Sequence, residues 1–145
     1  MALLTKLSVV TPSFIKFEGP AEIVVMPGAA GDFAALANHA PMLSTLRVGV
    51  LRAMVVHDGA GTEAKATRRI EFAVDGGFAE VLPDKVIVLT DAALSSADID
   101  LARARADLKR AEEALAQKRG SEDARERHDV AWAQARLDVT HKPAR

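Results

Sequence analysis

The stretch from Gly31 to Leu43, GDFAALANHAPML, holds the side chains best placed to make polar contacts from turns. Gly31-Asp32 is a turn signal, and Asn38-His39-Ala40-Pro41 combines a residue that tolerates left-handed backbone with a proline of fixed φ. We therefore expect tight turns at the end of a sheet to present a carboxylate, Asp32, and an imidazole, His39, for binding. No catalytic group stands beside them in the sequence.

Residue types that commonly act in catalysis or bind metals show no matching arrangement. The four histidines have neither ligand spacing nor acidic company; they are His39, His57, His128 and His141. Serines such as Ser13, Ser44 and Ser121 are explained by turns, strands or caps, and there is no cysteine. The sequence therefore predicts neither an enzyme nor a metal site.

A formal G-x-G-x-x-A match at residues 59–64 is the one hint of a dinucleotide site. Such a site needs a helix directly after the glycines, whereas residues 65–74 have the pattern of a strand. A hairpin loop is the interpretation we favour.

The chain has 145 residues, with 19 basic and 20 acidic side chains. The net charge of -1 argues against nucleic acid or anionic lipid as the main partner. The N-terminus lacks a basic leader and a cleavage site, and no run reaches the roughly 18 to 20 apolar residues that span a bilayer. We expect a soluble chain without a signal peptide.

Composition changes sharply near residue 92, which predicts two domains, 1–91 and 92–145. The first contains short β-branched and apolar blocks separated by glycine and proline, typical of an antiparallel sandwich or barrel. The expected strands are Leu4–Val10, Phe14–Phe17, Ala21–Met26, Phe33–Leu36, Met42–Leu46, Val48–His57, Thr67–Val74, Phe78–Leu82 and Lys85–Thr90. We also expect Phe72 and Phe78 in the core, Ala73 on the opposite face of its strand, and Val86–Leu89 buried on both sides.

The second domain is rich in alanine, leucine and charge. Ser95-Ser96 with Asp98 and Asp100 predicts the start of one helix. Its apolar seam is Leu101, Ala104, Leu108, Ala111 and Leu115. Gly120 then suits a C-terminal cap, and Ser121 the start of a second helix that ends near Thr140. The predicted fold is α+β: an N-terminal antiparallel β-sandwich followed by an antiparallel two-helix hairpin.

The seam of the second helix, Val130, Ala133 and Leu137 with flanking alanines, buries little apolar area. The hairpin is therefore either a lever that can leave the sandwich or a hairpin docked there permanently, and the sequence leaves both open. We expect Trp132 to pack against the sandwich or a partner.

With these features in place, the chain resembles the epsilon-subunit family of bacterial F-type ATP synthases over nearly its full length. The blocks that carry the resemblance are SVVTP, VVMPGAAGDFAALANHAPMLSTLRVGVLR, FAVDGGFAEVLPDKVIVLTDAA and IDLARA. The most specific feature is the combination G-D-F, N-H-A-P and L-x-x-G-x-L-R in one block.

The resemblance implies a non-catalytic subunit of the central stalk, which couples proton-driven rotation to ATP synthesis. The implied partners are the gamma subunit, the c-ring and the alpha/beta catalytic head, with membrane association only through the complex. It further implies that Asp32 and His39 lie at the contact with gamma and the c-ring, with Asp in place of the more usual Glu. The hairpin would inhibit ATP hydrolysis when it extends into the head. The implied location is the cytoplasmic face of the bacterial inner membrane.

Some members of the family bind ATP as a regulatory ligand through the hairpin. The resemblance implies that Asp100, Arg103, Ala104, Arg110 and Arg136 form such a site, although no cofactor is required. Two positions depart from those members, because Leu94 replaces a glutamate and Trp132 an arginine. The alternative role for Asp100 is to stabilise the helix start, with Arg103 paired to it or to Asp107.

The alternative function is a free-standing β-sandwich whose hairpin senses ATP or binds a protein, outside any ATP synthase. Co-purification with a gamma subunit would exclude this alternative.

Overall fold

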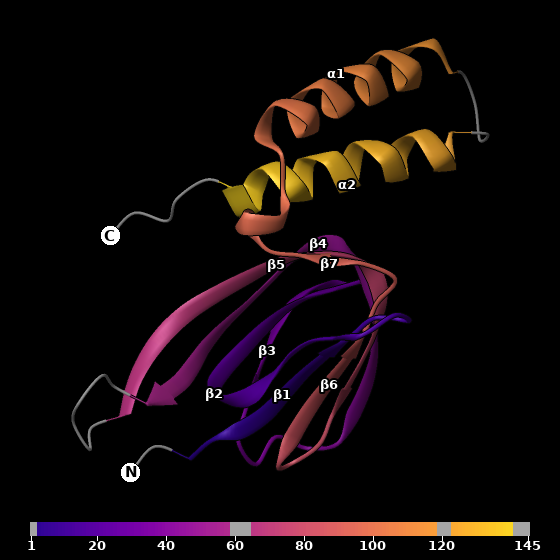
Figure 1. Cartoon of the computed structure of the whole chain (residues 1–145). Helices are drawn as coiled ribbons and strands as arrows, with labels where there is room; N and C mark the ends of the chain where they lie inside the picture. The colour runs from indigo at the N-terminus through magenta and orange to yellow at the C-terminus, as the bar shows by residue number, and fades with distance from the viewer. Residues whose placement is uncertain (1–2, 59–64, 119–122, 141–145) are drawn as a thin grey trace.

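The computed structural model describes residues 3–58, 65–118 and 123–140, which form a β-sandwich with a helical hairpin across one end (Figure 1). The predicted α+β fold and its order along the chain are confirmed. Three local predictions lie outside the described residues: the hairpin loop at 59–64, the Gly120 cap and the Ser121 cap.

The described strands form one sheet that closes on itself. They are β1 Thr5–Val10, β2 Ile15–Gly28, β3 Gly31–Leu36, β4 Met42–Asp58, β5 Lys65–Val81, β6 Lys85–Leu89 and β7 Ala93–Leu94. The strand order is β1-β6-β5-β4-β2-β3, and β1 also pairs with β2, so β3 is left at an edge. The pairs are antiparallel, as predicted, except for the parallel pair of β1 with β6. Strand β7 lies beyond residue 91, the predicted division, and still pairs with β5.

Three of the strands are much longer than predicted, because β2, β4 and β5 each join two of the expected strands. The break predicted between the strands Phe14–Phe17 and Ala21–Met26, which contains Gly19-Pro20, is wrong. Gly19 pairs with Leu7 of β1, Ala21 pairs with both β1 and β4, and from Ile23 onward β2 pairs with β4 and no longer with β1. The turn residues therefore mark the corner at which β2 passes from one layer of the sandwich to the other, an irregular site that tolerates proline.

The break predicted between Thr67–Val74 and Phe78–Leu82 is also wrong. Asp75-Gly76-Gly77 forms a corner of the same kind within β5. Gly76 and Gly77 have φ angles of 69° and 114°, values that favour glycine. A Cβ added to Gly77 would lie 2.0 Å from the Leu89 carbonyl oxygen. The chain bends sharply there and the strand continues, so the glycines create a corner rather than a loop.

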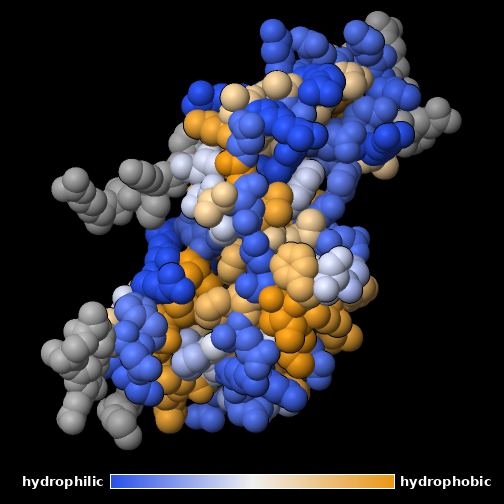
Figure 2. Space-filling view, in the orientation of Figure 1, coloured by the Kyte–Doolittle hydropathy of each residue, from blue (hydrophilic) through white to orange (hydrophobic). Residues whose placement is uncertain are grey.

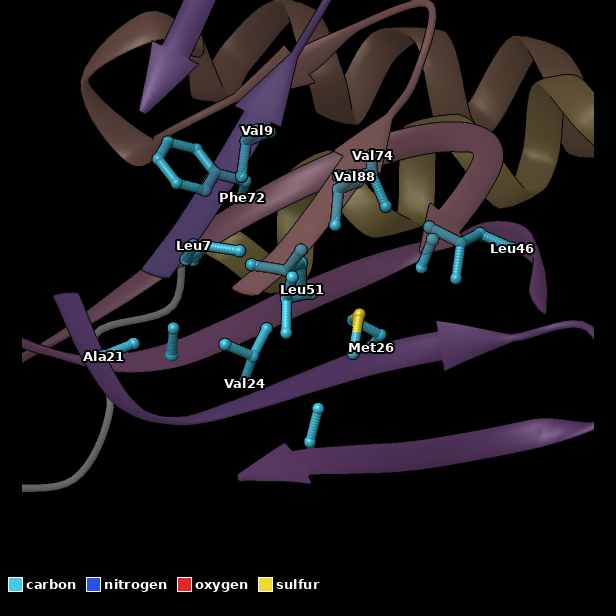
Figure 3. Packing of buried hydrophobic residues seen from close by; sticks show 14 of the residues in the cluster. Leu7, Val9, Ala21, Val24, Met26, Leu46, Leu51, Phe72, Val74 and Val88 are labelled. Atoms are coloured by element: carbon cyan, nitrogen blue, oxygen red, sulfur yellow. The ribbon is translucent and has the colours of Figure 1, made fainter. Parts of the chain in front are cut away.

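The core lies between the two layers (Figure 3). Leu7, Val24 and Leu51 are fully buried, and Phe72 is buried as predicted. The expectation for Phe78 is wrong, since its side chain is 51% exposed, and so is the two-sided burial of β6, since Leu89 is also 51% exposed. Phe78 and Leu89 are cross-strand partners on β5 and β6, and their exposure shows that the docked hairpin leaves them uncovered.

The hairpin consists of a short 3-10 turn η1 at Ser96–Asp98, helix α1 at Leu101–Gln117 and helix α2 at Ala124–Thr140. The first helix was predicted to start at Ser95-Ser96, but the structure has two elements there. Ser95 caps η1, and Asp100 caps α1. The Asp100 Oδ1 accepts the Arg103 backbone N–H at 3.1 Å. The helical conformation is interrupted between η1 and α1 at Ile99, whose backbone is extended.

Helix α2 packs on β4 and β5, and α1 packs on α2 on the side away from the sandwich (Figure 1). The buried contact is made by small side chains: Ala73 of β5 packs with Ala135 and Val139 of α2. The partly buried side chains around it are Val48, Val50, Ile99 and Trp132. The predicted packing of Trp132 against the sandwich is confirmed. Ala73 is buried because α2 covers the outer face of β5 there.

Candidate functional site

A cleft of about 330 Å³ runs between the two helices and is lined by charged groups from both. Asp107 of α1 is one of these groups. Its Oδ1 accepts from Arg110 Nη2 at 3.0 Å, and its Oδ2 accepts from Arg136 Nη1 at 3.0 Å. The structure thus brings together two arginines that the resemblance implies for ATP, and places a carboxylate between them.

Arg136 is held firmly in this cleft. Its guanidinium lies 5.6 Å from the centre of the Trp132 ring, within the range of a cation–π contact, and its side chain is only 16% exposed. The sequence left open whether Arg103 pairs with Asp100 or with Asp107, whereas in the structure Asp107 pairs with Arg110 and Arg136. The spacing Asp107-Arg110, three residues apart on one helix, was the available signal.

The other three residues implied for ATP binding do not line this cleft. Asp100 caps α1, and Ala104 is buried. Arg103 has an exposed side chain, and its backbone N–H donates to Asp100. The cap that was weighed as the alternative role for Asp100 is present.

Asp32 lies at the start of β3, beside a second cleft of about 450 Å³ between the sandwich and α2. Its carboxylate pairs with Arg47 at 2.5 Å and with Arg52 at 3.5 Å. Arg47 also donates to the Gly28 carbonyl oxygen at 2.6 Å. These contacts fix Asp32 to β4 on the side of the sandwich that faces the hairpin.

His39 lies at the opposite end of β3. Its Nδ1 is 2.6 Å from the Ala40 carbonyl oxygen, and the neighbouring Asn38 N–H donates to the Pro83 carbonyl oxygen at 2.7 Å. Asn38 has a φ of 65°, as the turn signal predicted. The expectation that one end of the sheet presents both Asp32 and His39 is wrong, because the residues between them form a strand that pairs with β2.

Two ion pairs tie the hairpin to the sandwich. Lys16 of β2 donates to Asp98 of η1, and this contact is the main reason why the pKa of Asp98 is lowered. His128 of α2 contacts Asp75 at the β5 corner, and the hydrogen bond to Asp75 is the main cause of the raised pKa of His128. The partners are 82 and 53 residues apart in the sequence, so no local pattern could have indicated them.

The outer face of the sandwich formed by β2, β1, β6, β5 and β4 carries an apolar patch. Ile15, Leu43, Phe78 and Leu89 are 58%, 72%, 51% and 51% exposed, and Val10 joins Ile15 to Leu89 through the strand pairing. Figure 2 shows hydrophobic residues gathered over this side of the sandwich, while the hairpin above is mostly hydrophilic. Contiguous exposed apolar surface of this kind is typical of a protein interface.

Among residues 3–58, 65–118 and 123–140, no group of three or more histidine or acidic side chains is placed to hold a metal ion. None of the helices that the structure describes is both long enough and apolar enough to cross a membrane.

Comparison with protein families matches both parts of the chain. Residues 4–96 match the family described as ATP synthase, Delta/Epsilon chain, beta-sandwich domain. Residues 97–139 match the family described as ATP synthase, Delta/Epsilon chain, long alpha-helix domain. The two matches together span the described fold.

Relatives with similar sequences match this chain over nearly its full length. An ATP synthase epsilon chain from Syntrophobacter fumaroxidans is 39% identical over 98% of this chain and 99% of its own length. The ATP synthase epsilon chain 2 of Ralstonia nicotianae is 36% identical over 100% of this chain and 98% of its own.

Solved structures show the same fold. A chain of the mitochondrial ATP synthase of Euglena gracilis superposes with a TM-score of 0.68 at 20% identity, covering 90% of this chain and 76% of that one. A central-stalk and c-ring structure from Tetrahymena thermophila gives a TM-score of 0.54 at 11% identity, covering 94% and 92%. With both domains matched and full-length relatives at this level of identity, this chain belongs to the family of ATP synthase epsilon chains.

Proposed function

We propose that this chain is a non-catalytic rotor subunit in the central stalk of a bacterial F-type ATP synthase. In this role it couples proton-driven rotation to ATP synthesis, and its hairpin restrains ATP hydrolysis. The observation that carries the proposal is the match of both domains to the ATP synthase families, combined with an uncovered apolar face on the sandwich.

The apolar patch around Phe78 and Leu89 is the surface that we assign to the gamma subunit. Both side chains lie on the outer face of paired strands and are half exposed. A partner that covers them gains apolar burial worth roughly 25 cal/mol per Å². The hairpin does not compete for this face, since it docks on β4 and β5 at the end of the sandwich.

We assign the c-ring contact to Asp32 and His39. Because these residues flank β3, a contact that used both would run along this strand rather than across one end of the sheet. Strand β3 is the edge strand, and the outward side chains Ala34 and Leu36 are exposed along it. Single replacements Asp32→Ala and His39→Ala should each weaken ATP-driven proton pumping in the assembled enzyme, with Asp58→Ala as the exposed control.

The weak contact between the hairpin and the sandwich is consistent with a hairpin that can undock. Its buried contact with the sandwich is made mainly by alanines and valines, which bury less area than leucines would. The outward face of α1 carries exposed cations, including Arg103, Arg105 and Lys109. An extended hairpin would present these cations to the alpha/beta catalytic head.

The location that follows is the cytoplasmic face of the bacterial inner membrane, with the chain held there through the complex. The near-neutral net charge gives the chain no strong attraction of its own for anionic lipid or nucleic acid.

Assembly into a bacterial ATP synthase that lacks its own epsilon chain tests the rotor role. We expect co-purification with gamma and restored proton pumping for the full chain. Phe78→Glu should abolish co-purification, whereas Leu101→Glu, at an exposed apolar position on α1, should not. Failure of the unaltered chain to bind gamma would favour the free-standing module instead.

Nucleotide sensing by the hairpin is a second function, favoured by the convergence of Arg110 and Arg136 in one cleft. Paired guanidinium groups suit phosphate oxygens. Calorimetric titration with ATP, with and without Mg²⁺, should show binding that Arg136→Ala removes. Arg105→Ala, an exposed arginine of α1 that does not line the cleft, is the matched control, and Arg103→Ala tests the remaining implied arginine. No binding up to millimolar ATP would leave the hairpin as a purely mechanical part.

A further inference from the structure

We propose that His128 and Asp75 form a proton-sensitive latch that holds α2 on the sandwich. The latch is closed while the imidazole is protonated and opens as the pH rises. Docking of the hairpin would thereby depend on pH, whether or not a nucleotide is bound.

The contact is an ion pair between α2, which would move, and strand β5 of the sandwich, which would stay in place. His128 Nε2 lies 2.5 Å from Asp75 Oδ1. Within the part of the chain that the structure describes, this is the polar side-chain bond that joins α2 directly to the sandwich. The other contact there is the apolar cluster of Ala73, Ala135 and Val139, with Val48, Val50, Ile99 and Trp132 packed around it. The ion pair adds to this apolar contact a contribution that depends on pH.

Asp75 is held firmly in position. It stands at the β5 corner just before the positive-φ glycines, and it pairs with Val48 of β4. Its backbone N–H donates to the Ala92 carbonyl oxygen at 3.0 Å. The carboxylate is 22% exposed, whereas the His128 side chain is 45% exposed, so protons from solvent reach the imidazole.

The charged groups around the imidazole all favour its protonated form. Asp75 faces it from β5, and Asp129 of α2 lies 3.4 Å from its Nδ1. Strand β4 contributes the uncharged Val48 beside Asp75, while its cations Arg47 and Arg52 are engaged by Asp32.

The direction follows from linkage. The hydrogen bond to Asp75 raises the pKa of docked His128 above its ordinary value of 6.5. A raised pKa in the docked state means that protonation strengthens docking. This contribution is fully present below the ordinary value and is lost as the pH rises through the raised one.

The second tie, between Lys16 and Asp98, does not involve the imidazole. The Lys16 contact lowers the pKa of Asp98 below its ordinary value of 3.8, so this carboxyl group stays ionised at neutral pH. That pair joins the sandwich to η1, at the root of the hairpin. Opening of the His128 latch therefore frees α2 while the root remains attached.

The functional consequence rests on the proposed restraint of hydrolysis by an extended hairpin. Acidification would hold the hairpin down, and alkaline conditions would favour its release. The latch itself can be tested on the isolated full chain, so its failure and the failure of the proposed function are separable.

The single tryptophan supplies the reporter, because Trp132 lies in the contact between α2 and the sandwich. The emission of the full chain is followed from pH 5.5 to 8.5, together with the amide protection factors along α2, which are corrected for the intrinsic rise of exchange with pH. We expect a red shift of the emission and lower protection factors as the pH rises. In parallel, the His128 ring resonances should titrate above the ordinary value, and in Asp75→Asn they should return toward it.

His128→Gln and Asp75→Asn should both flatten the pH profile of the emission and of the protection factors, while Asp129→Asn should retain it. Lys16→Met should weaken docking at every pH and keep the profile. A wild-type profile that is already flat would overturn the latch. So would a pH dependence that persists in His128→Gln, because another group would then be responsible.

Discussion

Arg136 of α2 donates a hydrogen bond to Asp107 of α1, with 3.0 Å between Nη1 and Oδ2. The two residues are 29 positions apart and close the hairpin from opposite helices. Their side chains are only 16% and 26% exposed, so the pair is more shielded from solvent than most surface ion pairs. The same carboxylate also engages Arg110. In this arrangement Asp107 stabilises the hairpin and occupies the arginines that a phosphate would need.

Asp107→Asn should therefore strengthen ATP binding. Removal of a carboxylate from beside the phosphates relieves about 1 kcal/mol of repulsion, or roughly a fivefold decrease in Kd. Calorimetric titration of the full chain measures this change. Asp138→Asn, whose residue pairs with Gln134 outside the cleft, should leave the affinity unaltered. Weaker binding in Asp107→Asn would contradict the competition.

Gly77→Ala should destabilise the sandwich strongly. A Cβ at this position would meet the Leu89 carbonyl oxygen at 2.0 Å, and its φ of 114° is unfavourable for alanine. Strain of the backbone alone costs about 1 to 3 kcal/mol, and the clash adds to it. Gly31→Ala is the matched control, since its φ of 138° is also unfavourable but a Cβ there meets nothing within 4 Å. Urea denaturation should show a clearly larger loss for Gly77→Ala, and equal losses would contradict the close approach.

Leu51→Ala should cost about 2 to 5 kcal/mol of unfolding free energy, because it opens a cavity in the closed core. Leu51 is fully buried between the layers. Leu43→Ala removes the same atoms from a side chain that is 72% exposed, and should change the stability by less than about 0.5 kcal/mol. If the two variants lost similar stability in urea titrations, the assignment of inner and outer faces would be wrong.

Acid should loosen the root of the hairpin. The contact with Lys16 is the main cause that lowers the pKa of Asp98 below its ordinary value of 3.8. A lowered pKa contributes stability that is present above the ordinary value and is lost as the pH falls through the lowered one. The amide protection factors near η1, corrected for the intrinsic exchange rate, should fall in the wild type as the pH drops through the lowered pKa of Asp98. In Asp98→Asn the protection should already be lower at neutral pH and should lack the acid step; an unchanged acid step would implicate a different carboxyl group.

The sequence predicted the order of elements well, because alternation in strands and alanine seams in helices are local signals. It failed where local signals are ambiguous. Glycine and proline at Gly19-Pro20 and at Gly76-Gly77 indicate turns, but a strand that bends between two layers uses the same residues. Only the pairing partners distinguish the two cases.

The candidate site was less predictable for a similar reason. Arg110 and Arg136 were identified through family resemblance, yet the position of Asp107 between them depends on how the two helices pack. The separation of Asp32 from His39 depends on the pairing of β3 with β2. The His128–Asp75 contact joins residues from different domains, which no spacing rule relates.

The central claim is that the hairpin restrains ATP hydrolysis when it leaves the sandwich and extends into the catalytic head. Its most direct test compares ATP hydrolysis by a bacterial ATP synthase assembled with the full chain or with a chain that ends at Ser95, which retains β7 in the sheet. We predict the same amount of assembled enzyme and a severalfold higher rate of hydrolysis with the shortened chain. Equal rates, with assembly intact, would contradict the claim and leave the hairpin without a regulatory role.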